Sequence, residues 1–163
     1  MRLALYQPDI PQNLGAAIRL GACLAVPLDV IEPCGFPLSD KSLRRAAMDY
    51  GEIGEMARHD SWAKFLGAPE RAVGRLVLFT TKGAIPHVDF IFQPGDTLLF
   101  GRESAGVPDE VHARADARVF VPIAEGTRSL NLATAAALAL AEGLRQTIGF
   151  PKVGLPVLSG ARY

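Results

Sequence analysis

Short apolar runs recur along the chain and alternate with longer segments whose apolar residues follow helical spacing. The runs typical of strands are residues 3–6, 28–31, 76–81, 97–100 and 118–121. Helical spacing covers residues 14–24, residues 130–147 and two segments that end at Met48 and Leu66. Strands that alternate with helices in this way predict an α/β fold, a mostly parallel sheet with helices on both faces.

Each predicted helix follows a residue that can cap its first turn. The candidate caps are Asn13, Asp40, either Asp60 or Ser61, and Ser129. The last helix is so rich in alanine and leucine that apolar residues lie on most of its circumference. Such a helix is expected to be buried on two sides, and the simplest second partner is another copy of the chain. We therefore predict a homodimer.

The composition is that of one globular domain, which we place at residues 1–163 with an irregular closing segment at 151–163. Hydrophobic residues make up 49% of the 163 residues and charged residues 21%, enough apolar material for a packed core. The formal net charge is zero. A polybasic arm that binds nucleic acid by charge alone is therefore absent, and any RNA must be held by a local patch.

No segment predicts export, a membrane span or a metal site. The chain opens directly on a strand, and its longest apolar stretch, residues 133–141, is too short to cross a bilayer of about 30 Å. Cys23 and Cys34 form no CxxC motif, and the three histidines stand at no ligand spacing from them. We expect a cytoplasmic protein with reduced thiols, no structural metal and no membrane partner.

The first of three polar loops at strand ends is NLGAAIR, residues 13–19. In an open α/β sheet, ligands bind at the carboxyl ends of the strands, so the position itself favours function. Asn13 and Arg19 are the residues that could face a ligand there. A capping asparagine and a solvated arginine are the structural alternatives.

The second loop is FGRESAGVP, residues 100–108, directly after an apolar strand. Gly101 and Gly106 suit a tight loop whose backbone approaches a ligand closely. The loop is neither a P-loop nor a GxGxxG fingerprint, because Val107 stands where a P-loop has its lysine. Glu103 is either a functional carboxylate or a solvated one.

The third loop is EGTRSLNL, residues 125–132, and it leads into the last predicted helix. A capping role explains Ser129 but leaves Asn131 without an explanation. An asparagine buried in the first turn of a helix either binds a polar ligand or braces the neighbouring loop, and the sequence leaves both open.

Taken together, the order and spacing of the three loops resemble the three signature motifs of the SpoU family of RNA ribose methyltransferases, in the SPOUT superfamily. The segments LYQPDIPQN at 5–13, IEP at 31–33, LRRA at 43–46 and TTKG at 80–83 are similar to the subgroup that acts on the wobble nucleotide of tRNA. The resemblance implies a C-terminal trefoil knot where the cofactor S-adenosylmethionine binds. It also implies methylation of the 2′-oxygen of cytidine or uridine 34, with tRNA-Leu as the first expected substrate.

The resemblance carries site roles onto named positions. It implies that Arg19, Glu103, Ser129 and Asn131 surround the reacting ribose. The implied cofactor residues are Phe79, Thr80, Gly101, Glu103, Gly106, Val121, Ile123, Ser129 and Leu130, with Leu132 completing the wall. The implied RNA contacts, to the anticodon stem-loop, are Asn13, Arg19, Arg44, Arg45 and Arg128.

The role of Arg19 needs separate treatment, because a guanidinium with a pKa of about 12 or more is a poor general base. Our hypothesis is that Arg19 grips the adjacent phosphate, that a phosphate oxygen or water takes the hydroxyl proton, and that Glu103 orients loop and arginine. Three positions depart from common family residues: Arg102, Ala133 and Ala141.

Substrate choice is less constrained than the chemistry. A basic surface is predicted from Lys41, Arg44, Arg45, Arg58, His59 and Lys64, although such residues also form ordinary solvated faces. Two alternatives to a wobble methyltransferase stay open. One is a SpoU enzyme acting on another tRNA or rRNA position, and the other is an RNA-binding or nucleotide-binding module without activity.

Overall fold

A seven-stranded parallel sheet forms the centre of the computed structural model, which describes residues 1–38 and 55–152. Its strand order is β3-β2-β1-β6-β4-β7-β5, and each neighbouring pair is parallel. The strands are β1 (Arg2–Tyr6), β2 (Leu28–Ile31), β3 (Met56–His59), β4 (Leu76–Phe79), β5 (Ile85–Pro86), β6 (Thr97–Phe100) and β7 (Ala117–Phe120). The predicted α/β class and parallel sheet are confirmed.

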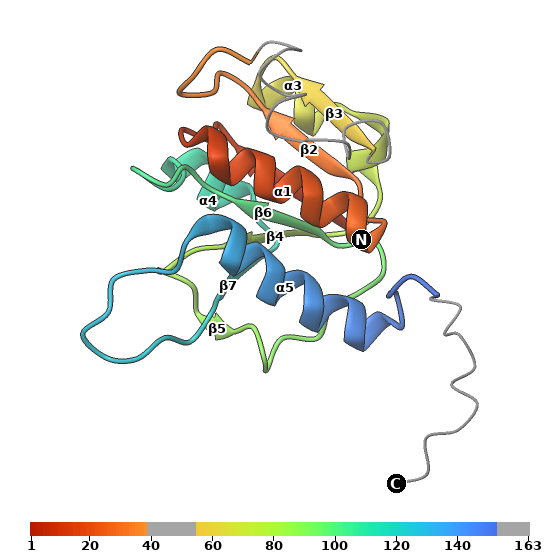
Figure 1. Cartoon of the computed structure of the whole chain (residues 1–163), viewed down its shortest axis with the longest axis vertical. Coiled ribbons are helices and arrows are strands. Elements are labelled where there is room, and N and C mark those ends of the chain that lie inside the picture. The colour runs from red at the N-terminus through yellow and green to blue at the C-terminus, as the bar shows by residue number, and fades with distance from the viewer. Residues whose placement is uncertain (39–54, 153–163) are drawn as a thin grey trace, which may run out of the picture.

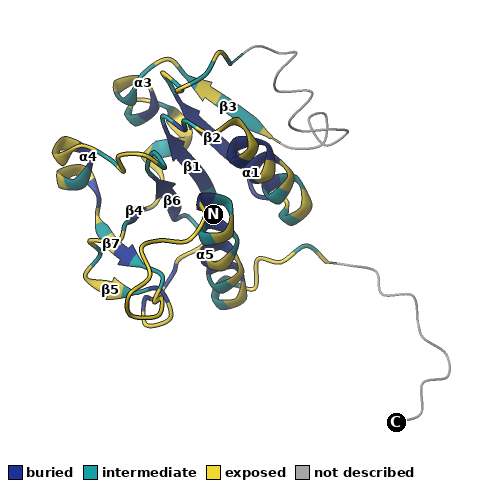
Figure 2. Cartoon of the chain, turned by 60° about the vertical axis from the view of Figure 1, so that its left-hand side comes forward, coloured by how far each residue is buried: buried dark blue, intermediate teal, exposed yellow. Residues whose placement is uncertain are grey.

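Helices cover both faces of this sheet (Figure 1). They are α1 (Pro11–Leu24), α3 (Trp62–Leu66), α4 (Asp109–Arg114) and α5 (Leu132–Thr147), with a 3₁₀ turn, η2 (Pro69–Ala72). The larger core cluster joins α1 and α5 to one face through Leu14, Ala136 and Leu140, and the smaller one joins α3 and α4 to the other through Phe65 and Val111. The central strands β1, β4 and β6 are buried throughout apart from the first residue of β1, as continuous apolar runs in a doubly covered sheet require (Figure 2).

Helix α1 begins earlier than the sequence pattern suggested. Pro11 occupies its first turn, where a missing N–H costs nothing, and the residue at the cap is Ile10, which makes no side-chain capping bond. The prediction that Asn13 caps this helix is therefore wrong. Asn13 is only 6% exposed, so its side chain is available for contacts within the protein.

Helix α5 also begins at a different residue from the one predicted. Asn131, not Ser129, is its cap, and the Asn131 side chain accepts a hydrogen bond from the Thr134 N–H at 3.2 Å. Every third or fourth residue of α5 is buried against the sheet and α1, including Ala136, Ala139 and Leu140. The opposite stripe, which includes Leu138, is exposed in the single chain. In a single chain, α5 is therefore buried on one side only.

Several elements depart from the predicted pattern. Elements β3, β5, α4 and η2 were not predicted, β4 ends two residues earlier than predicted, and β7 is displaced by one residue. Ser61 caps α3, as one of the two alternatives proposed. The predicted helix to Met48 lies outside the described residues. The trefoil knot stays a prediction, because strand order and register do not define how the chain is threaded. Within residues 1–38 and 55–152, no helix is long and apolar enough to cross a membrane.

Candidate active site

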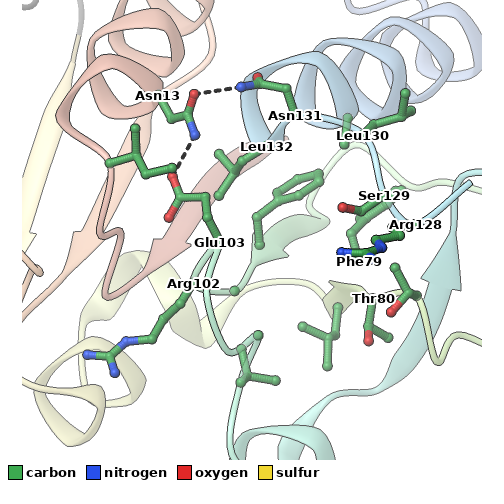
Figure 3. A pocket seen from close by; sticks show the side chains of 18 residues that line it. Asn13, Phe79, Thr80, Arg102, Glu103, Arg128, Ser129, Leu130, Asn131 and Leu132 are labelled. Carbon is green, nitrogen blue, oxygen red and sulfur yellow. Dashed lines mark hydrogen bonds between the residues drawn. The ribbon is translucent and has the colours of Figure 1, made fainter.

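Two adjoining cavities open at the carboxyl ends of β4, β6 and β7. Their volumes are about 520 and 460 Å³, and they share the wall formed by Phe79, Thr80, Phe100 and residues 128–130. The first cavity is bounded in addition by the start of α1 and the loop after β6, and the second by the segment after β7. All three signature loops therefore meet at one hollow, as the edge of a parallel sheet dictates (Figure 3).

A chain of hydrogen bonds joins the three loops across this hollow. The Asn131 Nδ2 donates to Asn13 Oδ1 at 2.8 Å, and Asn13 Nδ2 donates to Glu103 Oε1 at 2.8 Å (Figure 3). The second carboxylate oxygen of Glu103 accepts from the Asp9 N–H at 3.0 Å. Residues separated by 90 or more positions in sequence are thus held by direct side-chain contacts.

The direction of each bond is fixed by its neighbour. Because the Asn131 Oδ1 caps α5, its Nδ2 must face Asn13, and the Asn13 amide must then turn its own Nδ2 toward an acceptor. Glu103 in its ionised form is that acceptor. For Asn131, the structure therefore supports the bracing alternative. For Asn13, it shows an amide engaged at both ends within the protein.

Asp9 extends the network on the far side of Glu103. Its Oδ2 accepts from the Ser104 N–H at 3.3 Å and also from the Ser104 hydroxyl. Burial, followed by the nearby Asp9 carboxyl, raises the pKa of Glu103. The same pairing, followed by the Ser104 bonds, lowers the pKa of Asp9 to about 2. The two carboxyls therefore ionise as a pair, with Asp9 the stronger acid.

Glycines let the loop after β6 fold tightly enough to present Glu103. Arg102 and Gly106 exchange two backbone hydrogen bonds of 3.0 and 2.8 Å, which close the loop on itself. Gly106 adopts a φ of +68°, a conformation that favours glycine. A Cβ on Gly101 would lie 2.6 Å from the backbone of Gly106 and would force the loop open, whereas a Cβ on Gly106 would have room and would be strained only by the backbone conformation.

Most of the predicted site residues line these cavities. The first cavity includes Asn13, Gly101, Glu103, Gly106, Asn131 and Leu132; the second includes Val121 and Ile123; both include Phe79, Thr80, Arg128, Ser129 and Leu130. Asn131 is exposed at the cavity mouth, and the prediction that it is buried is wrong. Sequence reasoning did not find the roles of Asp9 and Ser104, whose only signal was their position inside the motif segments.

Arg19 is the exception among the predicted catalytic residues. It lies on an exposed position of α1 and lines neither cavity of the single chain. The two cavities therefore bring together Glu103, Ser129 and Asn131 but not Arg19, and the role of Arg19 at the ribose stays a prediction.

The predicted basic surface holds only in part. Lys41, Arg44 and Arg45 lie outside the described residues. Arg58 bonds Glu32 at 2.9 Å, and His59 lies 2.8 Å from the buried Asp29 with its side chain 10% exposed. His59 therefore links strands β3 and β2 and does not belong to a solvated cationic patch. Lys64 is exposed.

The expected cofactor, S-adenosylmethionine, fits the character of the cavities. A purine and a thioether need apolar walls with nearby backbone groups. Phe79 and Phe100 stack at 4.9 Å beneath the hollow, and Ile123 and Leu130 expose 37% and 38% of their surface at its rim. In residues 1–38 and 55–152, no group of three His, Cys, Asp or Glu is placed to hold a metal ion, and metal independence stays a prediction.

Comparison with known proteins identifies the family. The model of the SpoU rRNA Methylase family matches residues 1–141. This chain belongs to the SpoU family. A tRNA (cytidine(34)-2′-O)-methyltransferase of Beijerinckia indica is 54% identical over 151 residues, which are 93% of this chain and 94% of that protein.

Solved structures agree with this assignment. One, described as giving structural insights into the 2-OH methylation of C/U34 on tRNA, has a TM-score of 0.82 at 44% identity and covers 89% of this chain and 94% of its own. The SpoU methyltransferase AviRb of Streptomyces viridochromogenes, in complex with AdoMet, has a TM-score of 0.78 at 28% identity and covers 90% of this chain and 60% of its own.

Proposed function

We propose that this SpoU protein transfers the methyl group of S-adenosylmethionine to the ribose 2′-oxygen of cytidine or uridine 34 in tRNA, with tRNA-Leu as the first substrate to test. The observation that carries the proposal is the hydrogen-bonded convergence of the three family motifs on one cavity. Relatives whose names state this activity span nearly the same length of chain. The proposal places the protein in the cytoplasm.

The cofactor role falls to the apolar walls and loop backbones. Phe79, Val121, Ile123 and Leu130 would enclose the adenine and thioether, while the Gly101–Gly106 loop, Thr80 and Ser129 supply polar groups at the same wall. When bound, S-adenosylmethionine supplies a methyl group made electrophilic by its sulfonium. No metal is part of the proposal.

The contribution of the protein to the reaction is positioning. The Asn131–Asn13–Glu103 chain fixes the relative placement of the loops that face the ribose. Holding the reacting oxygen, carbon and sulfur in line can supply on the order of 7–11 kcal/mol of the barrier. Arg128 and Arg19 are the cations assigned to the RNA backbone, with Arg19 as a phosphate clamp. The hydroxyl proton passes to a phosphate oxygen or water, because a guanidinium remains protonated.

A homodimer gives Arg19 a route to the reaction. Since Arg19 lines neither of the two cavities described above, we propose that it acts as a clamp at the cavity of a second copy. Leu138 on the outer stripe of α5 and the following Ile148 and Phe150 are 42%, 93% and 47% exposed, an apolar surface that a second copy would cover.

Subunit mixing tests the dimer and the clamp together. Arg19→Ala subunits mixed with Asn131→Ala subunits form heterodimers in which one site has intact loops and an intact Arg19 from the other chain. Each variant alone should be inactive, and we expect methylation to return when the two are mixed. No return, despite exchange of subunits, would place Arg19 in its own site or outside the reaction.

The function itself is tested with labelled S-adenosylmethionine and total tRNA from a strain that lacks the gene, because whole tRNA retains any prior modification. We expect label as a 2′-O-methyl group at nucleotide 34. Label in ribosomal RNA alone would keep the chemistry and overturn the tRNA assignment. Cofactor binding without transfer to any RNA would indicate a non-catalytic module.

A further inference from the structure

Arg102 stands at the base of the loop that presents Glu103. Its backbone is held by the two hydrogen bonds to Gly106, at 3.0 and 2.8 Å, so its Cα has a fixed place at the edge of the first cavity. Its side chain runs away from Phe79 and Ser129, on the opposite side of the loop from Arg128 (Figure 3). The two arginines that line this cavity therefore lie on its two sides.

The Arg102 guanidinium has no partner among the residues that the structure describes. Its Nε is buried and makes no hydrogen bond, and its Nη atoms form no ion pair or hydrogen bond. By contrast, Arg2, Arg58, Arg75 and Arg145 each bond a carboxylate. A buried donor left without an acceptor is costly, and such groups in native proteins call for an explanation.

The two acids of the loop network, Glu103 and Asp9, are engaged by donors other than Arg102. Glu103 receives hydrogen bonds from Asn13 and from the Asp9 N–H, and Asp9 receives two from Ser104. Burial, followed by the charge of Glu110, raises the pKa of the Tyr6 phenol on the neighbouring strand β1, and the charge of Arg102 opposes this rise. Among the described residues, Arg102 is thus a cation at the rim of the cavity with no acid bonded to it.

We propose that Arg102 binds a phosphate of the RNA chain next to the target nucleotide and so acts as a positioning residue for the reaction. A guanidinium presents a planar fork of donors that matches two phosphate oxygens, and phosphate contacts fix the register of a nucleic acid without reading its sequence. With Arg128 on the other side, the target nucleotide enters between two cations. This inference rests on the proposed function and adds a contact that the three family motifs do not require.

The test compares Arg102→Gln with Arg114→Gln, a matched loss of one exposed arginine on α4 that lines neither cavity. Affinity for total tRNA is measured by filter binding across a salt series, independently of methyl transfer. Arg102→Gln should weaken binding about tenfold and lower the slope of log K against log salt by about 0.7–0.9, the value of one phosphate contact. Arg114→Gln should leave the slope close to the wild-type value.

Further readouts separate RNA positioning from a structural role. Arg102→Gln should raise the KM for tRNA while the melting temperature and the Kd for S-adenosylmethionine stay at wild-type values, and Arg102→Lys should restore part of the affinity through its charge. A slope and KM equal to those of Arg114→Gln, or a parallel loss of cofactor binding, would overturn the inference. Failure of the wild-type protein to methylate tRNA would overturn the proposed function, and the binding comparison would still decide the role of Arg102.

Discussion

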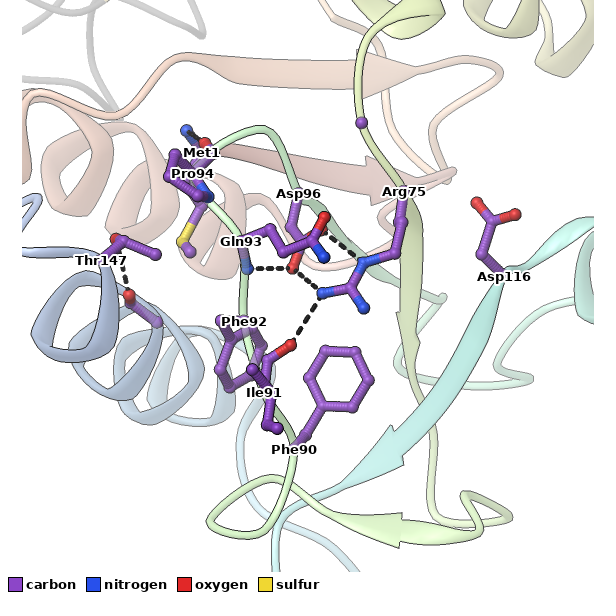
Figure 4. A network of polar contacts seen from close by, with 12 residues as sticks. Met1, Arg75, Phe90, Ile91, Phe92, Gln93, Pro94, Asp96, Asp116 and Thr147 are labelled. Atoms are coloured by element: carbon purple, nitrogen blue, oxygen red, sulfur yellow. Dashed lines mark hydrogen bonds and ion pairs between the residues drawn. The ribbon is translucent and has the colours of Figure 1, made fainter.

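The two edges of the sheet each carry a polar network, and the contrast between them separates stability from function. At the amino edge, Asp96 is fully buried and accepts from Arg75 Nε and Nη2 at 2.9 and 2.8 Å and from the Gln93 N–H at 2.8 Å (Figure 4). The same guanidinium donates to the Ile91 carbonyl and lies over the Phe90 ring. Every charge there has an opposite charge or a hydrogen-bond partner.

The polar network at the carboxyl edge has a different composition. Its centre is a carboxyl pair, Asp9 and Glu103, held by the Asn13 amide, the Ser104 hydroxyl and backbone donors, and no cation of the described residues is bonded to either acid. Two cavity arginines remain without partners in the described chain. A network completed within the protein stabilises the fold, whereas one that leaves cations and a cavity exposed is prepared for an anionic substrate.

The largest expected effect lies at the amino edge. Asp96→Ala leaves Arg75 without its buried counter-charge and should lower the free energy of unfolding by about 3–5 kcal/mol, measured by urea denaturation. Methyl transfer per folded molecule should stay close to that of the wild type, with Asp96→Asn as a milder variant. Arg145→Ala, which removes an exposed pair, is the matched control for stability. A loss of turnover in folded Asp96→Asn would show that the network at the amino edge also serves the reaction.

The second effect lies at the carboxyl edge. Glu103→Gln offers one oxygen to two donors, so either Asn13 or the Asp9 N–H loses its acceptor. We expect kcat/KM to fall on the order of 10²-fold, because small displacements of the loops disrupt alignment, with a loss of about 1–3 kcal/mol in stability. Glu110→Gln on α4 controls for the change of charge. Wild-type kcat/KM in Glu103→Gln would show that the network does not serve the reaction.

A smaller effect distinguishes the two cap candidates of α5. Asn131→Ala removes the capping bond to Thr134 and the bond to the buried Asn13, and should cost at least about 1 kcal/mol of unfolding free energy, whereas Ser129→Ala should leave it nearly unchanged. Both variants should reduce activity. Equal losses of stability would mean that the cap is shared.

The smallest effect is a pH dependence. The pKa of Asp9 is lowered from 3.8 to about 2, so its stabilising contribution is complete above about pH 4 and is lost as the pH falls toward 2. The unfolding free energy of the wild type should therefore decline more steeply over this interval than that of Asp9→Asn. The unfolding free energies are measured by urea denaturation at pH 4, 3 and 2.5. The same decline in both proteins would contradict a lowered pKa of Asp9.

Sequence reasoning found the elements whose patterns are local. Buried strands such as β4 and β6 are continuous apolar runs, and the resemblance located the three loops of the site. The hydrophobic pattern did not predict β3, because this edge strand carries Arg58 and His59. Their partners, Glu32 and Asp29, become neighbours only in the sheet. A buried strand is predicted from a run of apolar residues, and β3 has no such run.

The capping errors have the same origin. Asn13 and Ser129 are residue types that favour caps, but the partners of Asn13 lie 90 and 118 positions away. A short-range preference cannot reveal a side chain whose contacts are made by the fold. The unpaired state of Arg102 is likewise visible only once Glu103 is seen to be occupied by other donors.

The central claim is that the three loops act as one unit through the Asn131–Asn13–Glu103 chain. The most direct test is a double-mutant cycle on kcat/KM for tRNA with Asn13→Ala, Asn131→Ala and the double variant. The double variant should lose little more than the more damaging single variant, because either change already disconnects the loops. Losses that add on a free-energy scale would show that the two asparagines act independently and that the loops do not form one unit.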